Sequence, residues 1–220
     1  MKFNFDDVYE IESGASHKKI YRFKNNNEGK IIVDFSYNYN DYLSFLEINK
    51  FLSMINISVP KIFVTDDTKS IIIMEDFGNN RYDKLINIID PKDILINAIN
   101  SLIEIQKAQK PTVNKFFKKY DLSSFTVEIA EFADFYFSKN NIYKDVVDEF
   151  FYIWKSEFKK LNFNWDSFVH KDFELSNLMH LSQRDGHLKC GILDFQNAFI
   201  GFSGWDVFSL LENPRIYFDD

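Results

Sequence analysis

The sequence has few of the features that mark secreted, membrane-spanning or nucleic-acid-binding proteins. Its one cysteine, Cys190, excludes a disulfide within the chain, and the apolar residues around it predict a buried core position. It has no apolar run of about 20 residues, the length that a helix needs to cross a bilayer. With 26 basic against 33 acidic residues its net charge is −7, which argues against nucleic acid or an anionic membrane surface as the main partner.

The N-terminus also lacks the pattern of a signal peptide. It turns acidic at Asp6-Asp7, where a signal peptide would be basic and then apolar. We therefore expect a soluble, cytoplasmic protein. A chain of 220 residues is long enough for one large domain or for two smaller lobes, each with a core of its own.

The N-terminal part alternates apolar and polar residues between short polar breaks, which predicts strands. From Tyr42 to Ile55 the apolar residues are instead spaced as on one face of a helix. Glu75-Asp76-Phe77-Gly78 then interrupts the pattern, so we place a hinge at 75–78 and an N-terminal lobe over 1–78. The expected strands of this lobe are 8–12, 19–23, 30–34, 61–65 and 70–74, with the helix inserted after the third.

The chain after residue 78 is predicted to form a mainly helical C-terminal lobe over 79–220. Asp90-Pro91 supplies an N-cap and a first-turn proline for one helix. Two further helices are expected over 125–136 and 146–161, with their aromatic stripes as core faces. Short strands are expected at 168–169, 178–181 and 188–193.

Polar residues at the ends of these last strands have a spacing that suits phosphoryl transfer from a metal-bound nucleotide. His170-x-Asp172 is followed by Asn177, and an apolar strand leads into Asp194. The turn at Asp185-Gly186 brings the strand ends together, so Asn177 and Asp194 can lie side by side. Mg²⁺ prefers oxygen ligands and typically takes one or two carboxylates plus phosphate oxygens. Asp172 is then left to accept the proton of a substrate hydroxyl.

Three other features allow two interpretations each. His170 either fixes the backbone of the catalytic loop from behind or is an ordinary core histidine, and we favour the first. The loop from Ser13 to Ser16 has a single glycine, so taken alone it is an ordinary turn more often than a phosphate cradle. The hinge at 75–78 is either a simple turn or a source of backbone groups for an adenine edge.

Two segments carry a resemblance to a known family. VHKDFELSNLM over 169–179 and GILDFQNAFIGFSGWD over 191–206 resemble the aminoglycoside phosphotransferase and choline kinase-like superfamily, and most closely the bacterial N-acetylmuramate/N-acetylglucosamine kinases. Further similarity occurs at 45–52, 59–63 and 74–78. The resemblance implies an α+β, bilobal protein-kinase-like fold, with a five-stranded antiparallel N-terminal lobe containing one helix and a mainly helical C-terminal lobe. It also implies a kinase of a small molecule that uses ATP and Mg²⁺.

The resemblance further implies roles for the polar residues of the C-terminal lobe. Asp172 is the expected catalytic base, in a catalytic loop over 168–177. Asn177 and Asp194 are the expected Mg²⁺ ligands, in a hairpin over 177–196.

Nucleotide-binding positions are implied in the N-terminal lobe. Gly14, Ala15 and Ser16 would lie over the phosphates, and Glu75 and Phe77 would lie at the adenine hinge. Two supporting carboxylates are implied as well: Asp206 would hold the catalytic loop, and Glu47 matches a helix glutamate that in many kinases pairs with a lysine on the third strand.

The sequence departs from the family pattern in two places. The third strand has Ile31-Ile32-Val33-Asp34 where many kinases have a lysine, and only Lys30 is near; the amino-sugar kinases share this departure. The chain also stops at Asp220, whereas the family continues for another helical segment. We expect a minimal form, a shortened product or one part of a split protein whose C-terminal lobe a partner completes.

The leading hypothesis is an ATP-dependent kinase that phosphorylates a hydroxyl of an amino sugar such as N-acetylmuramate or N-acetylglucosamine. The alternatives are an aminoglycoside- or choline-type kinase and a nucleotide-binding pseudokinase. The sequence does not predict the oligomeric state.

Overall fold

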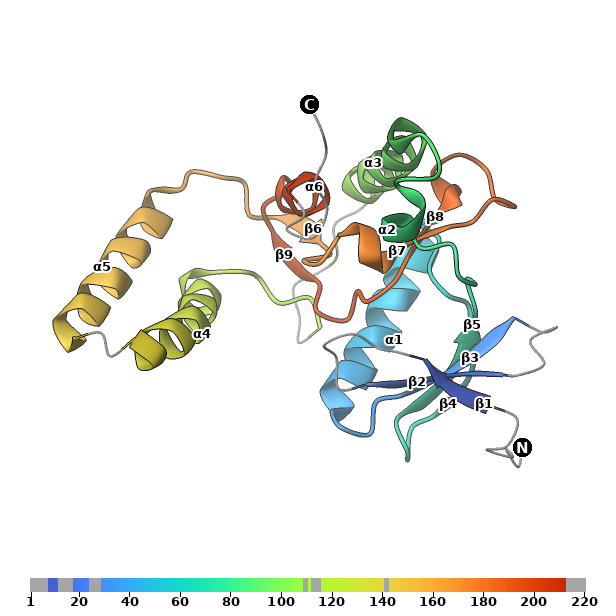
Figure 1. Ribbon diagram of the computed structural model, residues 1–220, viewed down its shortest axis with the longest axis horizontal. Helices are drawn as coiled ribbons and strands as arrows, with labels where there is room; N and C mark the ends of the chain where they lie inside the picture. Colours follow the sequence, from blue (N-terminus) through green and yellow to red (C-terminus); the bar gives the residue numbers. More distant parts are fainter. Residues whose placement is uncertain are drawn as a thin grey trace.

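The N-terminal part of the computed structural model is an antiparallel sheet with one long helix packed against it (Figure 1). The structure describes residues 8–11, 18–23, 29–108, 111, 116–140 and 143–212. The strand order is β1-β2-β3-β5-β4, so the strand after the helix forms one edge of the sheet. The elements are β1 (Val8–Ile11), β2 (Lys19–Phe23), β3 (Lys30–Asp34), α1 (Tyr39–Met54), β4 (Ile62–Asp66) and β5 (Ile71–Glu75).

Helix α1 forms where the sequence pattern predicts it and joins the sheet to the rest of the molecule. Asn38 caps its N-terminus, because the side-chain oxygen accepts a hydrogen bond from the N–H of Asn40. The buried face of α1 includes Phe45, which stacks on Phe195 with ring centroids 4.7 Å apart. Since Phe195 follows Asp194 in the chain, this contact fixes a predicted site segment against the helix of the sheet.

The second part of the molecule combines helices with two small two-stranded sheets. Strands β7 and β8 pair with each other, and β6 pairs with β9, a strand that the sequence pattern did not predict. Strand β8 begins later than predicted because residues 186–189 form a 3-10 turn. The elements are α2 (Tyr82–Leu85), α3 (Pro91–Lys107), β6 (Ser167–Val169), η2 (Leu175–Asn177), β7 (Leu178–His180), η3 (Gly186–Lys189), β8 (Cys190–Ile192), β9 (Phe199–Gly201) and α6 (Trp205–Leu211).

A single apolar core runs through both parts. It contains residues of β3, β5 and α1 together with residues of α3, β7 and β8. Cys190 lies in this core and is fully buried, as predicted. Among the described residues, no helix has both the length and the apolar character that a membrane span requires.

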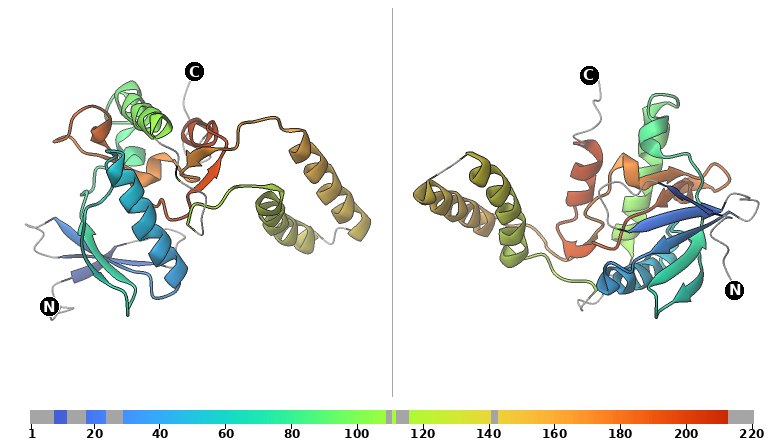
Figure 2. Two further views of the ribbon diagram at one scale, coloured as in Figure 1. Left: turned by 180° about the vertical axis from the view of Figure 1, so that it is seen from behind. Right: turned by 60° about the horizontal axis from the view of Figure 1, so that its bottom comes forward.

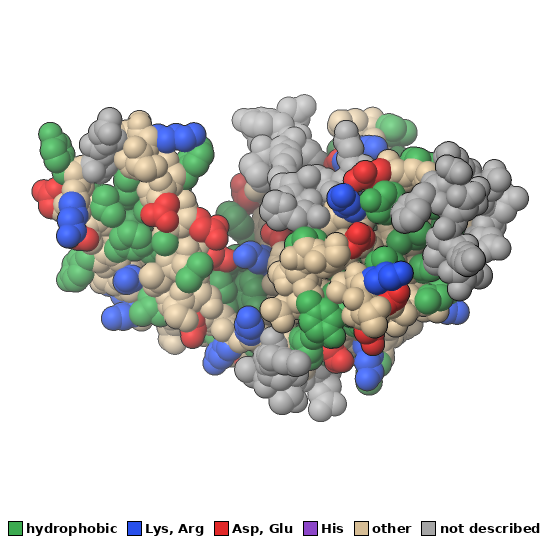
Figure 3. Space-filling view, turned by 90° about the horizontal axis from the view of Figure 1, so that it is seen from below, with side chains coloured by type: hydrophobic (Ala, Val, Ile, Leu, Met, Phe, Trp, Pro, Cys, Tyr) green, Lys and Arg blue, Asp and Glu red, His purple; other side chains and the backbone are tan. Residues whose placement is uncertain are grey.

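Helices α4 (Leu122–Asn140) and α5 (Lys144–Lys160) form a hairpin that projects from the body, which all views show (Figures 1 and 2). The expectation that their aromatic stripes are core faces is wrong for the described structure. Phe132 is 53% exposed, Trp154 is 46% exposed, and α5 has no buried residue. The stripes pack on each other, as in the stacked pair Phe132 and Phe150, so each helix covers only part of its partner's apolar side. Hydrophobic side chains therefore reach the surface here (Figure 3, left).

A second, smaller cluster of aromatic rings lies where the hairpin joins the body. Tyr120 and Phe199 are buried in it, with their centroids 4.9 Å apart. Trp165 stacks on Tyr120, and Trp205 contacts the same ring edge-on at 5.2 Å. This cluster lies next to the start of the predicted catalytic loop. It contains Val169, the last residue of β6, and its ladder partner Phe199 of β9, and the loop continues from β6.

Candidate functional site

The predicted catalytic loop begins where β6 ends and is held by the N-terminal part of α6. Asp206 accepts hydrogen bonds from the backbone N–H groups of His170 (2.8 Å) and Lys171 (3.1 Å). Lys171 has a φ of 84°, a backbone conformation that residues other than glycine rarely adopt. Its carbonyl accepts bonds from the indole N–H of Trp205 and the hydroxyl of Ser209. These contacts maintain the strained backbone at Lys171 and so set the direction in which the chain enters Asp172.

The carboxylate of Asp206 is buried and supports the catalytic loop, as the resemblance implies. It is 1% exposed, and burial raises the pKa of this carboxyl to about 7, although the two backbone N–H bonds act in the opposite direction. At this buried position Asp206 can hold the loop but cannot contact a substrate.

His170 is a positioning residue buried behind the loop. Its Nε2 lies 2.9 Å from the carbonyl oxygen of Leu193, the residue before Asp194. Burial lowers the pKa of this imidazole to about 4, so the ring is neutral at physiological pH. Since a carbonyl only accepts, Nε2 carries the proton and donates it. The bond ties the catalytic loop to the predicted metal segment.

We expect His170 to make the fold less stable in acid. Its pKa is lowered from 6.5 to about 4, so its contribution is complete above about pH 6.5 and is lost as the pH falls toward 4. The loss corresponds to about 3 kcal/mol. Asp206 titrates in the same range with the opposite sign, because its raised pKa favours the folded state on protonation.

The measurement must therefore compare variants. Urea unfolding of the wild type and of His170→Gln between about pH 7 and pH 4 should show that the wild type loses about 3 kcal/mol more. His187→Gln is the matched control, because the His187 ring also contacts a backbone carbonyl, that of Asn56 at 2.9 Å. Parallel curves for the wild type and His170→Gln would contradict the assignment.

Asp172 lies in the loop with its carboxylate available. The side chain is half-buried, and among the described residues it makes no side-chain hydrogen bond. Burial raises the pKa of this carboxyl; the charge of Lys171 lowers it, and the charge of Asp194 raises it further. A raised pKa is what a general base needs in order to hold a proton transiently.

The structure brings Asn177 and Asp194 to the paired end of β7 and β8. Leu178 and Ile192 are partners in the ladder, and the N–H of Leu193 donates to the carbonyl of Asn177 at 2.9 Å. The side-chain amide of Asn177 donates to the carbonyl of Asp172 at 2.9 Å. Asn177 is thus bonded through its side chain to the backbone of Asp172 and through its carbonyl to Leu193, the residue before Asp194.

Asp194 is held by two side chains that the sequence reasoning did not assign. The ammonium of Lys18, just before β2, forms an ion pair with Oδ1, and the amide of Gln196 donates to the same oxygen at 2.8 Å. Burial raises the pKa of Asp194, but Lys18 and Gln196 more than offset this effect, so the pKa is lowered overall. Asp194 is therefore ionised at neutral pH, and its backbone, at a φ of 61°, is a second point of strain.

The donor atoms fit a hard divalent cation that is shared with phosphate oxygens. The side-chain bonds of Asp194 involve Oδ1, and that of Asn177 involves Nδ2, so within the described part of the chain one oxygen of each residue makes no hydrogen bond. Carboxylate and carboxamide oxygens are ligands that Mg²⁺ accepts. Among the described residues there is no group of three His, Cys, Asp or Glu that could hold a metal ion, so an ion at Asn177 and Asp194 would need phosphate oxygens as further ligands.

The predicted hinge, residues 75–78, begins at Glu75, the last residue of β5. The carboxylate of Glu75 accepts a hydrogen bond from Arg184 at 2.7 Å, and the ring of Phe77 packs over Gly191. A Cβ at Gly191 would lie 2.7 Å from that ring, so this strand needs a glycine for Phe77 to occupy its place. Arg22 of β2, which the sequence reasoning missed, donates to Asp76 at 2.8 Å and so fastens the hinge to the sheet.

The predicted phosphate loop, Gly14, Ala15 and Ser16, lies outside the described residues. Glu47, which matches the helix glutamate of many kinases, is exposed on α1.

Lys30 lies at the hinge end of β3, opposite Glu75 in the ladder, with its Nζ 5.4 Å from the ring centroid of Phe63. The lysine that reaches Asp194 is Lys18, which follows the predicted loop after His17. Sequence spacing does not show that Lys18 meets a residue 176 positions away.

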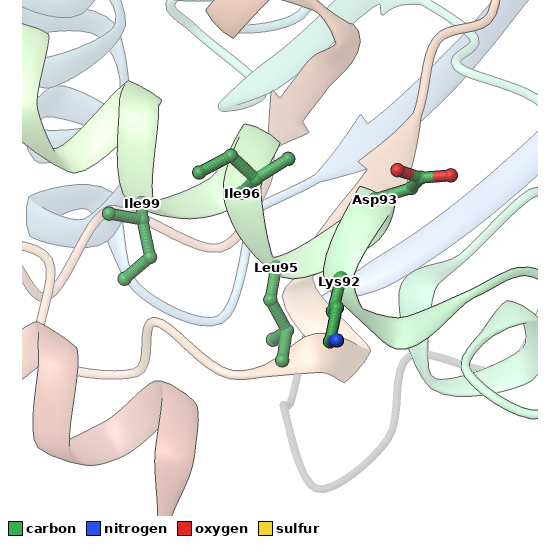
Figure 4. A pocket seen from close by; sticks show the side chains of 5 residues that line it. All are labelled: Lys92, Asp93, Leu95, Ile96 and Ile99. Atoms are coloured by element: carbon green, nitrogen blue, oxygen red, sulfur yellow. The ribbon is translucent and has the colours of Figure 1, made fainter.

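Two surface hollows lie elsewhere. One of about 480 Å³ is lined, among the described residues, by side chains of α3, which the close-up labels (Figure 4). The other, of about 910 Å³, lies beside the hinge between α1 and β4 and includes Glu75 and Arg184 in its lining. Neither is lined by Asp172, Asn177 or Asp194, so the candidate site rests on the chemistry and geometry of these side chains. The α3 hollow is lined by Lys92, Asp93, Leu95, Ile96 and Ile99.

Comparison with protein families and curated proteins gives matches over most of the chain. The family described as "Phosphotransferase enzyme family" matches residues 7–220. The chain is 25% identical over 194 residues to an N-acetylmuramate/N-acetylglucosamine kinase of Caulobacter vibrioides, covering 78% of this chain and 50% of that protein. It is 26% identical over 186 residues to a kinase of the same name from Neisseria meningitidis, covering 80% and 52%. The chain thus spans about half the length of these curated relatives.

Solved structures share its architecture. An ADP-bound aminoglycoside phosphotransferase superposes with a TM-score of 0.67 at 16% identity, covering 93% of this chain and 70% of that one. A choline/ethanolamine kinase family protein from Mesorhizobium loti superposes with a TM-score of 0.59 at 11% identity, covering 92% and 62%. At these identities the likeness concerns the fold alone. It confirms the expected α+β, bilobal protein-kinase-like fold.

Proposed function

The chain belongs to the phosphotransferase enzyme family, and from this membership we propose that it transfers the γ-phosphoryl group of ATP to a hydroxyl of an amino sugar. N-acetylmuramate and N-acetylglucosamine are the proposed substrates, because the curated relatives are kinases named for them. We further propose that residues 1–78 bind the nucleotide and that residues 79–220 carry the catalytic loop and the metal ligands.

One observation carries the proposal. Asp172 has a half-buried carboxylate with a raised pKa, and the amide of the neighbouring metal-ligand candidate Asn177 donates to its carbonyl. Phosphoryl transfer needs little covalent chemistry from the protein, so positioning and charge are the main contributions. A base in the catalytic loop, with a carboxamide and a carboxylate at the end of the neighbouring hairpin, supplies both.

In the proposed reaction Asp172 orients the substrate hydroxyl and accepts its proton. The hydroxyl oxygen forms a bond to the γ-phosphorus, the bond from that phosphorus to the bridging oxygen of ADP breaks, and the phosphorylated sugar and ADP leave. Asn177 and Asp194 would hold Mg²⁺, which supplies neutralisation of the phosphate charge. The bond from the Lys171 N–H to Asp206 would hold the loop while Asp172 acts.

The hinge is proposed to receive the adenine edge. The N–H groups of Glu75 and Asp76 donate to the carbonyls of Lys61 and Gly29, at 2.8 and 2.7 Å. The N–H of Phe77 makes no backbone hydrogen bond within the described part of the chain, so it is the hinge donor that a base can use. Nucleotide use as such is supported by the solved neighbours, which include ATP, ADP and GDP complexes.

Phosphate transfer from ATP to a panel of acceptors tests this function. The acceptors are N-acetylmuramate, N-acetylglucosamine, kanamycin and choline, each with Mg²⁺, and the product is detected by mass spectrometry. We expect phosphorylated amino sugar from the wild type and, over the same time, about 10²–10⁴-fold less from Asp172→Asn. Transfer to kanamycin or choline alone would overturn the assignment of an amino sugar as the substrate. ATP binding without transfer to any acceptor would overturn the proposed kinase activity and favour a pseudokinase.

A further inference from the structure

A lysine is buried where the two lobes meet. Lys18 is 8% exposed and immediately precedes β2, which begins at Lys19. Its ammonium forms an ion pair with Asp194 of the C-terminal lobe. An ammonium loses much hydration when it is buried, so such a position is stable only beside negative charge.

We propose that Lys18 binds the phosphates of the nucleotide, acting from the residue before the second strand in place of a lysine on the third. The inference rests on the proposed function, because it assigns a phosphate-binding residue to that same site. It concerns positioning and charge neutralisation, whereas proton transfer stays with Asp172.

Strand register places Lys18, and not Lys30, at the site. Lys19 pairs with Asp34, so Lys18 lies beyond the end of β3 that is opposite to Lys30. At about 3.3 Å per residue, the length of β3 separates the two positions by more than 10 Å. Lys30 instead pairs in register with Glu75 at the hinge.

The other cations near the site have different anionic partners. Arg22 pairs with Asp76, Arg184 with Glu75, and Lys171 with Glu128. The first two hold the hinge, and the third ties the catalytic loop to α4. Lys18 is therefore the described cation whose charge lies at the predicted metal ligand Asp194.

The ion pair is compatible with a bound nucleotide. A lysine ammonium has three N–H donors, so it can keep Oδ1 of Asp194 while it donates to phosphate oxygens. The other oxygen of Asp194 is left for Mg²⁺. Lysine and the metal would then approach the phosphates from two sides, with the carboxylate between them.

Titration calorimetry with Mg-ATP, Mg-ADP and adenosine tests the assignment. We expect Lys18→Met to weaken ATP and ADP about ten- to a hundredfold, the loss of a charged hydrogen bond, while adenosine binds as before. A purely structural role would instead weaken adenosine as well. Lys19→Met, on the exposed neighbour, and Lys30→Met, on the third strand, are the matched controls and should both bind ATP like the wild type.

A labelling experiment on the wild type covers the case in which Lys18→Met does not fold. An acyl phosphate of ATP carries its carbonyl next to the phosphates; a lysine amine there attacks this carbonyl, forms an amide, loses a proton and releases ATP. We expect labelling of Lys18 that excess ATP suppresses.

Each outcome decides between the claims. Labelling of Lys30 instead, or loss of ATP affinity in Lys30→Met and not in Lys18→Met, overturns the inference. If the wild type binds ATP and Lys18→Met binds it equally well, the Lys18 assignment alone fails. If the wild type does not bind ATP, the proposed function fails and the inference fails with it.

Discussion

Asp172→Asn is expected to lower turnover by about 10²–10⁴-fold, the usual contribution of a general base, while Mg-ATP binds as in the wild type. The reason is that the carboxamide keeps the size and polarity of the side chain but cannot accept the hydroxyl proton. The side chain makes no hydrogen bond to other described residues, so the change leaves the loop intact. Among the changes considered, this one has the largest expected effect on the reaction.

Steady-state turnover with the acceptor found in the panel, together with calorimetric ATP affinity, measures it. Glu174→Gln is the matched control, since it removes a carboxylate two positions away whose charge also raises the pKa of Asp172. We expect that control to retain most of the turnover. Equal turnover in Asp172→Asn and the wild type would remove Asp172 from the mechanism.

Asp194→Ala is expected to abolish the part of nucleotide stabilisation that depends on Mg²⁺. A ligand at a hundred times its Kd stabilises a protein by about 2.7 kcal/mol, which a thermal melt detects readily. The alanine variant is also less stable without nucleotide, because it leaves Lys18 buried without the carboxylate it pairs with.

The two effects are separated by melting each variant with EDTA, with Mg²⁺, with ATP and with both. Asp194→Asn keeps an oxygen for Lys18 and removes the charge that the metal needs, so it should lose the Mg²⁺-dependent shift with a smaller loss of basal stability. Asp185→Ala, an exposed carboxylate on the same hairpin, is the control. An unchanged Mg²⁺-dependent shift in Asp194→Ala would sink the metal assignment.

Helix α1 and several strands were predictable from sequence because their apolar residues recur on one face, whereas β5 was predictable as a continuous apolar run, which is buried at residues 72–74. The five strands of the sheet lie within about one residue of the expected positions, and α1 begins at Tyr39, three residues before the helical spacing that starts at Tyr42. The hairpin of α4 and α5 shows the limit of this reasoning. An aromatic stripe predicts a face that packs, but it does not say how much of that face its partner covers, and Phe132 stays half exposed.

The candidate site was predictable where its residues are close in sequence. Asp172 and Asn177 share one loop. Strand β7 follows Asn177 and pairs with β8, and Asp194 comes shortly after β8. The contacts of Lys18 and Asp206 were harder to see, because the ion pair of Lys18 and the backbone bonds to Asp206 depend on how distant segments meet. The family resemblance suggested a supporting role for Asp206, but no pattern pointed to Lys18.

Two of the tryptophans, Trp165 and Trp205, pack on the aromatic cluster beside the catalytic loop, so the intrinsic fluorescence of the protein reports on this region. All three tryptophans follow residue 150, so the five-stranded sheet contains none of them. The indole of Trp205 is bonded to the carbonyl of Lys171, and Trp165 stacks on Tyr120 in the same cluster. Intrinsic fluorescence is therefore a built-in probe of the catalytic loop and of the hairpin beside it. A change in emission when only a nucleotide is added would mean that its binding to the sheet has been transmitted across the lobes to that loop.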